Sequence, residues 1–192
     1  MLMTDSLALL LTPGAGADRT HHTLVAVEAA ARRSGRVTSV SRLDFPYRKA
    51  GKRAPDKAPV AVAHVRAAAR KLVNRAKLDP AALVLGGRSY GGRMCSMAVA
   101  EGLPAAGLVL LSYPLHPPGR PDRLRVEHFG SLELPVLFIS GEKDPFGTPA
   151  EFDEHVAAIP GPVTQCWLPG GHDPRNQDEV IAATVASWLA EL

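Results

Sequence analysis

The sequence predicts an α/β fold in which about six mostly parallel strands form a sheet flanked by helices. Short apolar runs alternate with longer segments of helical periodicity along the chain, and this alternation is typical of parallel strands that are covered on both faces. The 192 residues suit a single domain over residues 1–192. The 46% of hydrophobic residues is ordinary for a packed core.

The first half of the chain predicts two strands and two helices. Residues 7–11 are an apolar run that ends in a Pro-Gly turn, and residues 37–43 alternate between apolar and polar side chains, as half-buried strands do. Residues 19–33 and residues 60–76 carry their apolar side chains on one helical face. Between them, residues 45–59 are rich in Lys, Arg and Pro, which predicts a loop.

The second half continues the alternation. Short apolar runs predict buried strands, which we expect at residues 83–85, 108–111, 136–139 and 163–168. Longer segments between and after them predict helices at residues 89–101, 151–158 and 176–189. The Pro-rich linker between Ser112 and Pro135 is too short for a sizeable helical cap, so we expect no cap domain over the sheet.

Charge and hydropathy exclude several classes of protein. The net charge of +3 is small, whereas nucleic-acid binders of this size concentrate far more positive charge on one face, so no nucleic-acid partner is expected. No apolar run approaches the roughly 18 residues of a membrane span, so no membrane partner is expected either. The run at residues 7–11 is shorter than the core of a signal peptide, about 7–15 residues. These features favour a cytoplasmic location.

The most informative segment lies between a predicted strand and a predicted helix. Gly87-Arg88-Ser89-Tyr90-Gly91 fits the pattern G-x-S-x-G, which in this setting is typical of a nucleophile elbow. The serine sits on a tight, strained turn that projects its hydroxyl above the sheet. The positions two before and two after it are pressed against backbone, so only small residues fit there. Ser89 is therefore the candidate nucleophile.

A serine nucleophile needs a base and an acid that orients the base. In enzymes built on such an elbow these follow the serine in the order acid, then histidine, each just beyond a strand. Asp144 follows the predicted strand at residues 136–139, and His172 follows the one at residues 163–168. Glu142 is a rival acid, whereas Asp173 is a poor one because it adjoins His172.

These motifs, taken together, resemble an α/β-hydrolase of the compact, lidless, dienelactone-hydrolase-like kind. More narrowly, the chain is similar to the group of testis-expressed protein 30 and the third subunit of the non-specific-lethal histone acetyltransferase complex. The residues that carry the resemblance span nearly the whole chain: Thr12-Pro13-Gly14-Ala15-Gly16-Ala17-Asp18, Gly87 to Gly92, Ser112-Tyr113-Pro114-Leu115-His116-Pro117-Pro118, Gly141-Glu142-Lys143-Asp144 and Gly170-Gly171-His172. The resemblance implies the three-layer α/β-hydrolase fold.

The resemblance also implies roles for individual residues. Ser89 would be the nucleophile, Asp144 the acid and His172 the base. The segment Gly14-Ala15-Gly16 would form the first oxyanion loop, with the backbone N–H groups of Ala15 and Tyr90 holding the oxyanion. Many relatives have a histidine before the first of these glycines, where this chain has Pro13; the donors lie beyond that position.

Other residues are candidates for lining a pocket around the triad: Gly14, Gly16, His21, Arg88 and His116. Arg88 adjoins the nucleophile, and it suits either a carboxylate on the substrate or a structural acid of the protein. His21 and its neighbour His22 open a predicted helix, but no carboxylate or cysteine completes a recognisable ligand spacing, so no metal is expected. No cofactor is expected.

Two functions of different class fit these features. The first is a serine hydrolase that cleaves a small ester, thioester or related acyl compound through an acyl-enzyme. The alternative is a non-catalytic hydrolase fold that serves as an interaction module, which the resemblance to a chromatin-complex subunit suggests. A third hypothesis, nucleic-acid binding through the basic side chains of residues 48–77, ranks last because a solvated helix face also explains them.

Overall fold

The computed structural model describes residues 6–192, so the first five residues of the predicted domain lie outside it. Six parallel strands form one sheet in the order β2-β1-β3-β4-β5-β6. The strands are β1 (Leu7–Thr12), β2 (Val37–Arg42), β3 (Leu83–Arg88), β4 (Gly107–Leu111), β5 (Val136–Gly141) and β6 (Val163–Leu168). The predicted sheet of about six parallel strands is therefore confirmed.

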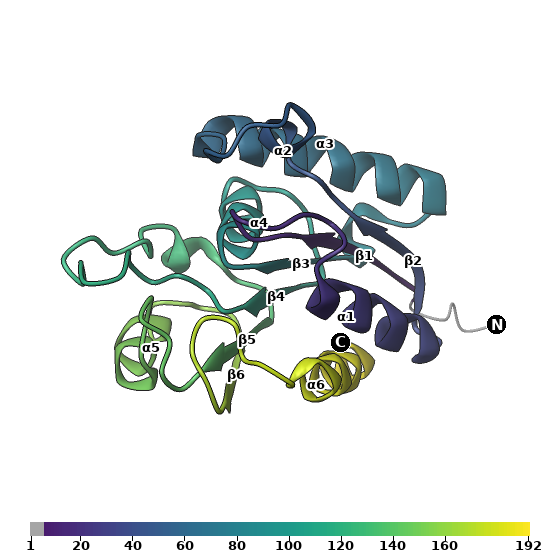
Figure 1. Ribbon diagram of the computed structural model, residues 1–192. Coiled ribbons are helices and arrows are strands. Elements are labelled where there is room, and N and C mark those ends of the chain that lie inside the picture. Colours follow the sequence, from purple (N-terminus) through teal and green to yellow (C-terminus); the bar gives the residue numbers. More distant parts are fainter. Residues whose placement is uncertain (1–5) are drawn as a thin grey trace.

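Helices cover both faces of this sheet (Figure 1). In the described residues the α-helices are α1 (His22–Arg33), α2 (Pro46–Lys49), α3 (Ala58–Ala76), α4 (Tyr90–Ala100), α5 (Pro149–Val156) and α6 (Asp178–Glu191). Helices α3 and α4 pack on one face, and α1 and α6 pack together on the other. The prediction of helices on both faces is confirmed, and residues 6–192 form no large cap over the sheet.

Alternation along the strands divides the core into two clusters. On β1, Ala8 and Leu10 face the cluster under α3 and α4, whereas Leu7, Leu9 and Leu11 face the cluster under α1 and α6. All six residues of β1 are buried. This is the pattern expected of a strand whose successive side chains point to opposite, equally covered faces.

The predicted loop at residues 45–59 is wrong in two places, because residues Pro46–Lys49 form the short helix α2 and because α3 already begins at Ala58. Pro46 occupies the first turn, where its fixed φ and missing N–H cost nothing. The first long helix also begins at His22 rather than at residue 19. The Asp18 carboxylate accepts hydrogen bonds from the backbone and side chain of Thr20 and holds the preceding residues in a turn.

The topology brings the candidate site residues to one edge of the sheet. Parallel strands end on the same side, and the segments that follow β1, β3, β5 and β6 carry the oxyanion-loop, nucleophile, acid and base candidates. Within residues 6–192 no helix is long and apolar enough to cross a membrane.

Candidate active site

Ser89 alone connects β3 to α4. The strand ends at Arg88 and the helix begins at Tyr90. Ser89 has φ 49° and ψ −118°, a positive φ that is strained for a residue with a side chain. Its backbone N–H donates to the carbonyl of Leu111 at 2.8 Å, which ties the strained turn to the end of β4. The predicted elbow geometry is therefore present.

The two glycines of the elbow motif permit close backbone approach. A Cβ added to Gly87 would lie 2.5 Å from the backbone nitrogen of Gly92, and one added to Gly91 would lie 2.5 Å from Thr12 Oγ1. Real Cβ contacts are longer than this, so no other residue fits at either position without a shift of backbone or of buried Thr12.

The side chains of Ser89, His172 and Asp144 form one hydrogen-bonded chain. His172 Nε2 lies 2.8 Å from Ser89 Oγ. On the other side of the ring, His172 Nδ1 lies 2.8 Å from Asp144 Oδ2 and 3.0 Å from Oδ1. The Asp144 side chain is 1% exposed and that of His172 is 21% exposed, so the acid is buried while the histidine reaches the surface.

Neighbouring groups fix the orientation of the acid and the histidine. The backbone N–H of Phe146 donates to Asp144 Oδ1 at 2.9 Å. The Phe146 ring stacks on the His172 ring, with centroids 4.1 Å apart. Arg88 Nη2 donates to the backbone carbonyl of His172 at 2.9 Å. The His172–Asp144 pair is therefore supported by Phe146, from the segment after β5, and by Arg88, at the end of β3.

The alternative acids lie elsewhere. Glu142 is exposed, and among the described residues it makes no hydrogen bond to His172. Asp173 pairs with Arg88 Nη2 at 2.8 Å. Of the two alternatives that the sequence left open for Arg88, the structure contains the pairing with an acid of the protein itself.

The predicted oxyanion loop lies beside Ser89. A Cβ added to Gly14 would lie 3.6 Å from Ser89 Cβ. The Ala15 carbonyl accepts a hydrogen bond from Tyr47 Oη at 2.6 Å, so α2, which the sequence analysis missed, holds this loop in place. Tyr90 is the first residue of α4, and its N–H is one of the helix-terminal donors that have no intrahelical acceptor.

The histidine candidates are placed differently from one another. The buried His116 ring lies 2.9 Å from the carbonyl of Pro117 through Nδ1 and 3.2 Å from Glu151 through Nε2, so it is engaged with the start of α5 and not with the triad. His21 lies across from Asp173, with 4.0 Å between Nε2 and Oδ1. Burial lowers the pKa of His21, and the positive charge of Arg88 lowers it further.

Contrary to the expectation from the sequence, a carboxylate lies close enough to His21 and His22 to complete a set of potential metal ligands. His21, His22 and Asp173 each offer one ligand atom, and these atoms lie within 4.8 Å of one another. This group has no signal in the sequence, because Asp173 lies about 150 residues from the two histidines along the chain and no ligand spacing encodes it.

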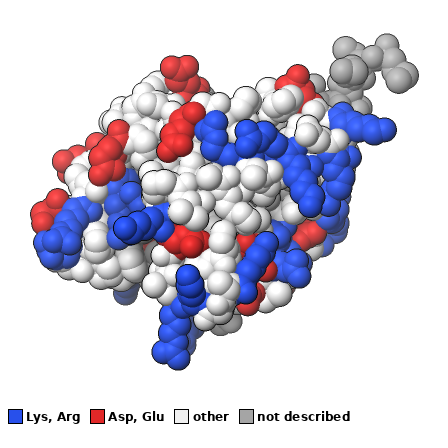
Figure 2. All heavy atoms as spheres, turned by 90° about the horizontal axis from the view of Figure 1, so that it is seen from above, with Lys and Arg blue, Asp and Glu red and all other residues white. Residues whose placement is uncertain are grey.

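The basic side chains of residues 48–77 do not share one surface: Arg66 donates to the carbonyls of Ala98 and Glu101 at the end of α4, whereas others lie toward β2. Lys49, Lys71 and Arg75 line a hollow of about 430 Å³ together with His64 and Arg19. In Figure 2, which shows the molecule from above, Lys and Arg gather mainly toward one side of the visible face, and acidic side chains are scattered over the rest.

One family model matches almost the whole chain. The family described as "Alpha/beta hydrolase domain" matches residues 5–187. The α/β-hydrolase fold predicted from the sequence is confirmed by this match and by the sheet order. The narrower resemblance to the group of testis-expressed protein 30 stays a prediction.

Solved structures of similar fold include several hydrolases. An alpha-beta serine hydrolase homologue from Coxiella burnetii is 16% identical, with 96% of this chain and 85% of that chain covered and a TM-score of 0.76. A structure of the metagenome-derived lipolytic enzymes LipS and LipT is 17% identical, with 97% and 94% covered and a TM-score of 0.75. The RedJ thioesterase from Streptomyces coelicolor is 18% identical, with 97% and 85% covered and a TM-score of 0.63. At these identities the likeness concerns the fold.

Proposed function

Because the chain belongs to the Alpha/beta hydrolase domain family, we propose that it is a serine hydrolase of small acyl compounds. Ser89 is the nucleophile, His172 the general base and Asp144 the acid that orients it. The substrate is an ester, a thioester or a related acyl compound, and the reaction passes through an acyl-enzyme. The 2.8 Å contact between His172 Nε2 and Ser89 Oγ is the observation that carries the proposal.

In the first step the Ser89 hydroxyl attacks the acyl carbon. His172 Nε2 takes the hydroxyl proton, and the imidazolium that forms is stabilised by the buried Asp144 carboxylate on Nδ1. The Asp144 contact also keeps the proton on Nδ1 before the attack, so that Nε2 presents its lone pair to Ser89. His172 then protonates the leaving group, and the acyl chain remains on Ser89 Oγ.

The tetrahedral oxyanion receives two backbone donors in this proposal. They are the N–H groups of Tyr90 and Ala15, of which the first stands at the positive end of α4. One such donor typically contributes about 10²–10³ in rate. The Tyr47–Ala15 hydrogen bond, which holds the loop, and the position of Gly14 close to Ser89 support this assignment.

Water completes the reaction by attacking the acyl-enzyme, with His172 again acting as the base. The site lacks a large cap over it, which favours short or exposed acyl groups over long lipids. The lipolytic enzymes and the thioesterase of similar fold support esters and thioesters as the first compounds to assay. The interaction-module alternative predicts that Ser89 has no enhanced reactivity.

Labelling with a fluorophosphonate probe tests the proposal. Wild type should be labelled, whereas Ser89→Ala removes the acceptor atom and His172→Ala removes the base, so both should lose labelling. Ser131→Ala, which alters an exposed serine of the described residues, is the matched control and should label like wild type.

The same four proteins should be assayed with a p-nitrophenyl acetate and a short acyl thioester. Each of the two triad variants should lose at least about 10³-fold in kcat. Unfolding curves establish that every variant is folded. Folded wild type that neither labels nor turns over either compound would contradict the hydrolase proposal and leave the interaction module.

A further inference from the structure

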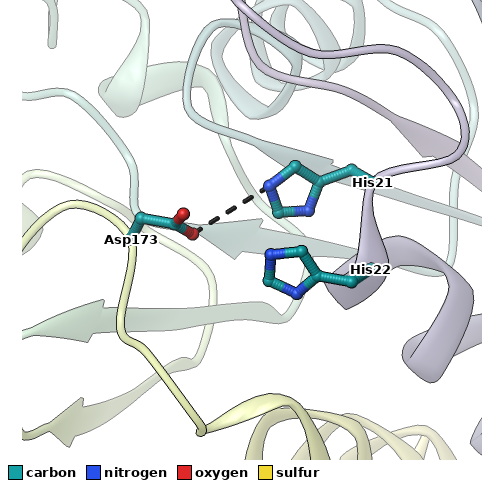
Figure 3. A group of neighbouring side chains, drawn as sticks. All are labelled: His21, His22 and Asp173. Atoms are coloured by element: carbon teal, nitrogen blue, oxygen red, sulfur yellow. Dashed lines mark ion pairs between the residues drawn. The ribbon is translucent and has the colours of Figure 1, made fainter.

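His21, His22 and Asp173 form a compact group that is close to the triad but separate from it (Figure 3). The two histidines stand at the start of α1, and Asp173 follows His172 in the connection from β6 to α6. The imidazole rings are stacked, with centroids 4.3 Å apart and an interplanar angle of 27°. As Figure 3 shows, both rings turn an edge toward the Asp173 carboxylate.

In each of the three residues, one nitrogen or oxygen atom that could bind a metal ion has no hydrogen-bond partner among the described residues. His22 Nδ1 lies 2.5 Å from Asp178 Oδ2, which leaves its Nε2 unengaged. His21 Nε2 faces Asp173 Oδ1 at 4.0 Å, a distance too long for a hydrogen bond. Asp173 Oδ1 pairs with Arg88, whereas Oδ2 accepts no hydrogen bond from residues 6–192.

We propose that this group is a zinc site, in which His21 Nε2, His22 Nε2 and an Asp173 carboxylate oxygen bind one Zn²⁺ ion. Two imidazoles and one carboxylate are a ligand set that zinc accepts, with water at the fourth position. Hard cations such as Mg²⁺ prefer all-oxygen sites. This site is independent of the proposed hydrolysis, because none of its three ligands belongs to the triad.

Outer-shell contacts support the assignment. Zinc-ligating histidines usually donate their second ring N–H to a carboxylate, which fixes the ring and strengthens the ligand. His22 has this arrangement through Asp178, and Thr23 Oγ1 donates to the other oxygen of the same carboxylate at 2.7 Å. Asp173 is oriented in turn by Arg88. Two of the three proposed ligands therefore have a partner that holds them in position.

Zinc binding requires a small closure of the three side chains. Zn–N bonds of about 2.0–2.1 Å place tetrahedral ligand atoms about 3.4 Å apart. The separations now reach up to 4.8 Å, so the side chains have to move inward by roughly one ångström. His22 and Asp173 have room for this, since their side chains are 59% and 53% exposed. The ion would join the start of α1 to the segment that carries His172.

Isothermal titration calorimetry of the tag-free full chain with ZnCl₂ tests the proposal. Wild type should bind one ion per chain, and His22→Ala and Asp173→Asn should each lower the affinity at least about tenfold. Asp178→Asn should lower it about 10- to 100-fold, although Asp178 does not touch the ion in this proposal. The neighbouring substitution Glu179→Gln should leave it unchanged.

Two further variants exclude other sources of zinc binding. His155→Ala removes a histidine on α5, away from the group, and should bind zinc like wild type. His172→Ala should also keep its zinc, because the proposed site does not use the triad histidine. The proposal is overturned if wild type binds no zinc, if His22→Ala binds it as tightly as wild type, or if His172→Ala alone loses it. Unfolding curves without zinc establish that the variants are folded.

Discussion

At the scale of single residues, the backbone geometry at Ser89 depends on neighbouring glycines, which have no side chain. The positive φ of Ser89 is maintained because β3, the 13–17 loop and α4 approach one another more closely than ordinary side chains permit. Gly91 is the clearest instance, because an added Cβ would meet the Pro13 carbonyl and the side chain and carbonyl of Thr12. Two of these three atoms are backbone and cannot rotate away.

We therefore predict that Gly91→Ala destabilises the protein and displaces the loop that contains Ala15. Overpacking of this kind typically costs about 1–3 kcal/mol in the free energy of unfolding. Urea denaturation should record that loss, and fluorophosphonate labelling of the folded variant should fall. Gly130→Ala is the matched control, since its Cβ would have a nearest neighbour 3.9 Å away; its stability should be unchanged or slightly raised. Equal stability of Gly91→Ala and wild type would contradict the close-approach argument.

The three residues of the Ser89–His172–Asp144 hydrogen-bond chain were predictable from the sequence, whereas the residues that support them were not. Ser89, Asp144 and His172 each follow a short apolar run, and the carboxyl ends of parallel strands meet at one edge. The pairing of Arg88 with Asp173 has no such signal, because it depends on the path of the segment between β6 and α6. For the same reason no sequence signal places Asp173 beside His21, whereas its position next to His172 was the ground for setting it aside as an acid.

At the scale of elements, hydrogen bonds and a buried aromatic ring hold the connection between β4 and β5 against the rest of the molecule. Tyr113 Oη donates to the carbonyl of Arg125 at 2.7 Å, and His128 Nε2 lies 2.7 Å from Ser96 Oγ on α4. Phe129 is fully buried next to them. The connection therefore packs against the sheet and does not form a cap, and His128 joins it to α4, the helix that follows Ser89.

This attachment should depend on pH. Burial, together with the charge of Arg93, lowers the pKa of His128 to about 4, whereas Glu127 opposes this shift. The unfolded chain has the ordinary histidine pKa of about 6.5, so it binds the proton first as the pH falls. The stability that His128 contributes is thus present above about pH 6.5 and is lost progressively as the pH falls to about 4.

The measurement is urea denaturation at pH 7.0, 5.5 and 4.5 for wild type and His128→Gln, which keeps a polar group but does not titrate. Carboxylates titrate in both proteins, so the difference between the two carries the information. Wild type should lose more stability than the variant between pH 7.0 and 4.5, and His155→Gln should follow wild type. Parallel curves for wild type and His128→Gln would show that His128 does not carry this dependence.

Elements with a clear period were predictable, and short irregular ones were not. The long helix α3 and all six strands follow from periodicity and apolar runs. The four residues of α2 are too few to show a period, and Lys, Arg and Pro around them indicate a loop. What stabilises α2 is tertiary: Tyr47 is buried and reaches Ala15, 32 residues earlier in the chain.

At the scale of the whole molecule, one sheet is shared by two apolar cores. The strands β1, β3, β4 and β5 contribute side chains to both clusters. Unfolding of these strands therefore disrupts both cores together. Each core carries one tryptophan: Trp167 packs against the cluster under α3 and α4, and Trp188 is buried in the cluster under α1 and α6. The sharing of strands implies one cooperative unfolding unit.

Leu24→Ala tests this cooperativity, because Leu24 is fully buried in the core under α1 and α6. The lost contacts and the resulting cavity should lower the free energy of unfolding by about 2–5 kcal/mol. The substitution is made in Trp167→Phe and in Trp188→Phe, so that fluorescence reports each core separately. If the sheet couples the two cores, the urea midpoints of both reporters fall by the same amount.

The control is Val25→Ala. Val25 is next to Leu24 in the chain and 41% exposed, so its substitution should change the free energy of unfolding by less than about 0.5 kcal/mol. A midpoint that falls for Trp188 but not for Trp167 would mean that the two faces unfold separately. The sheet would then be held by the core under α3 and α4 without help from α1 and α6.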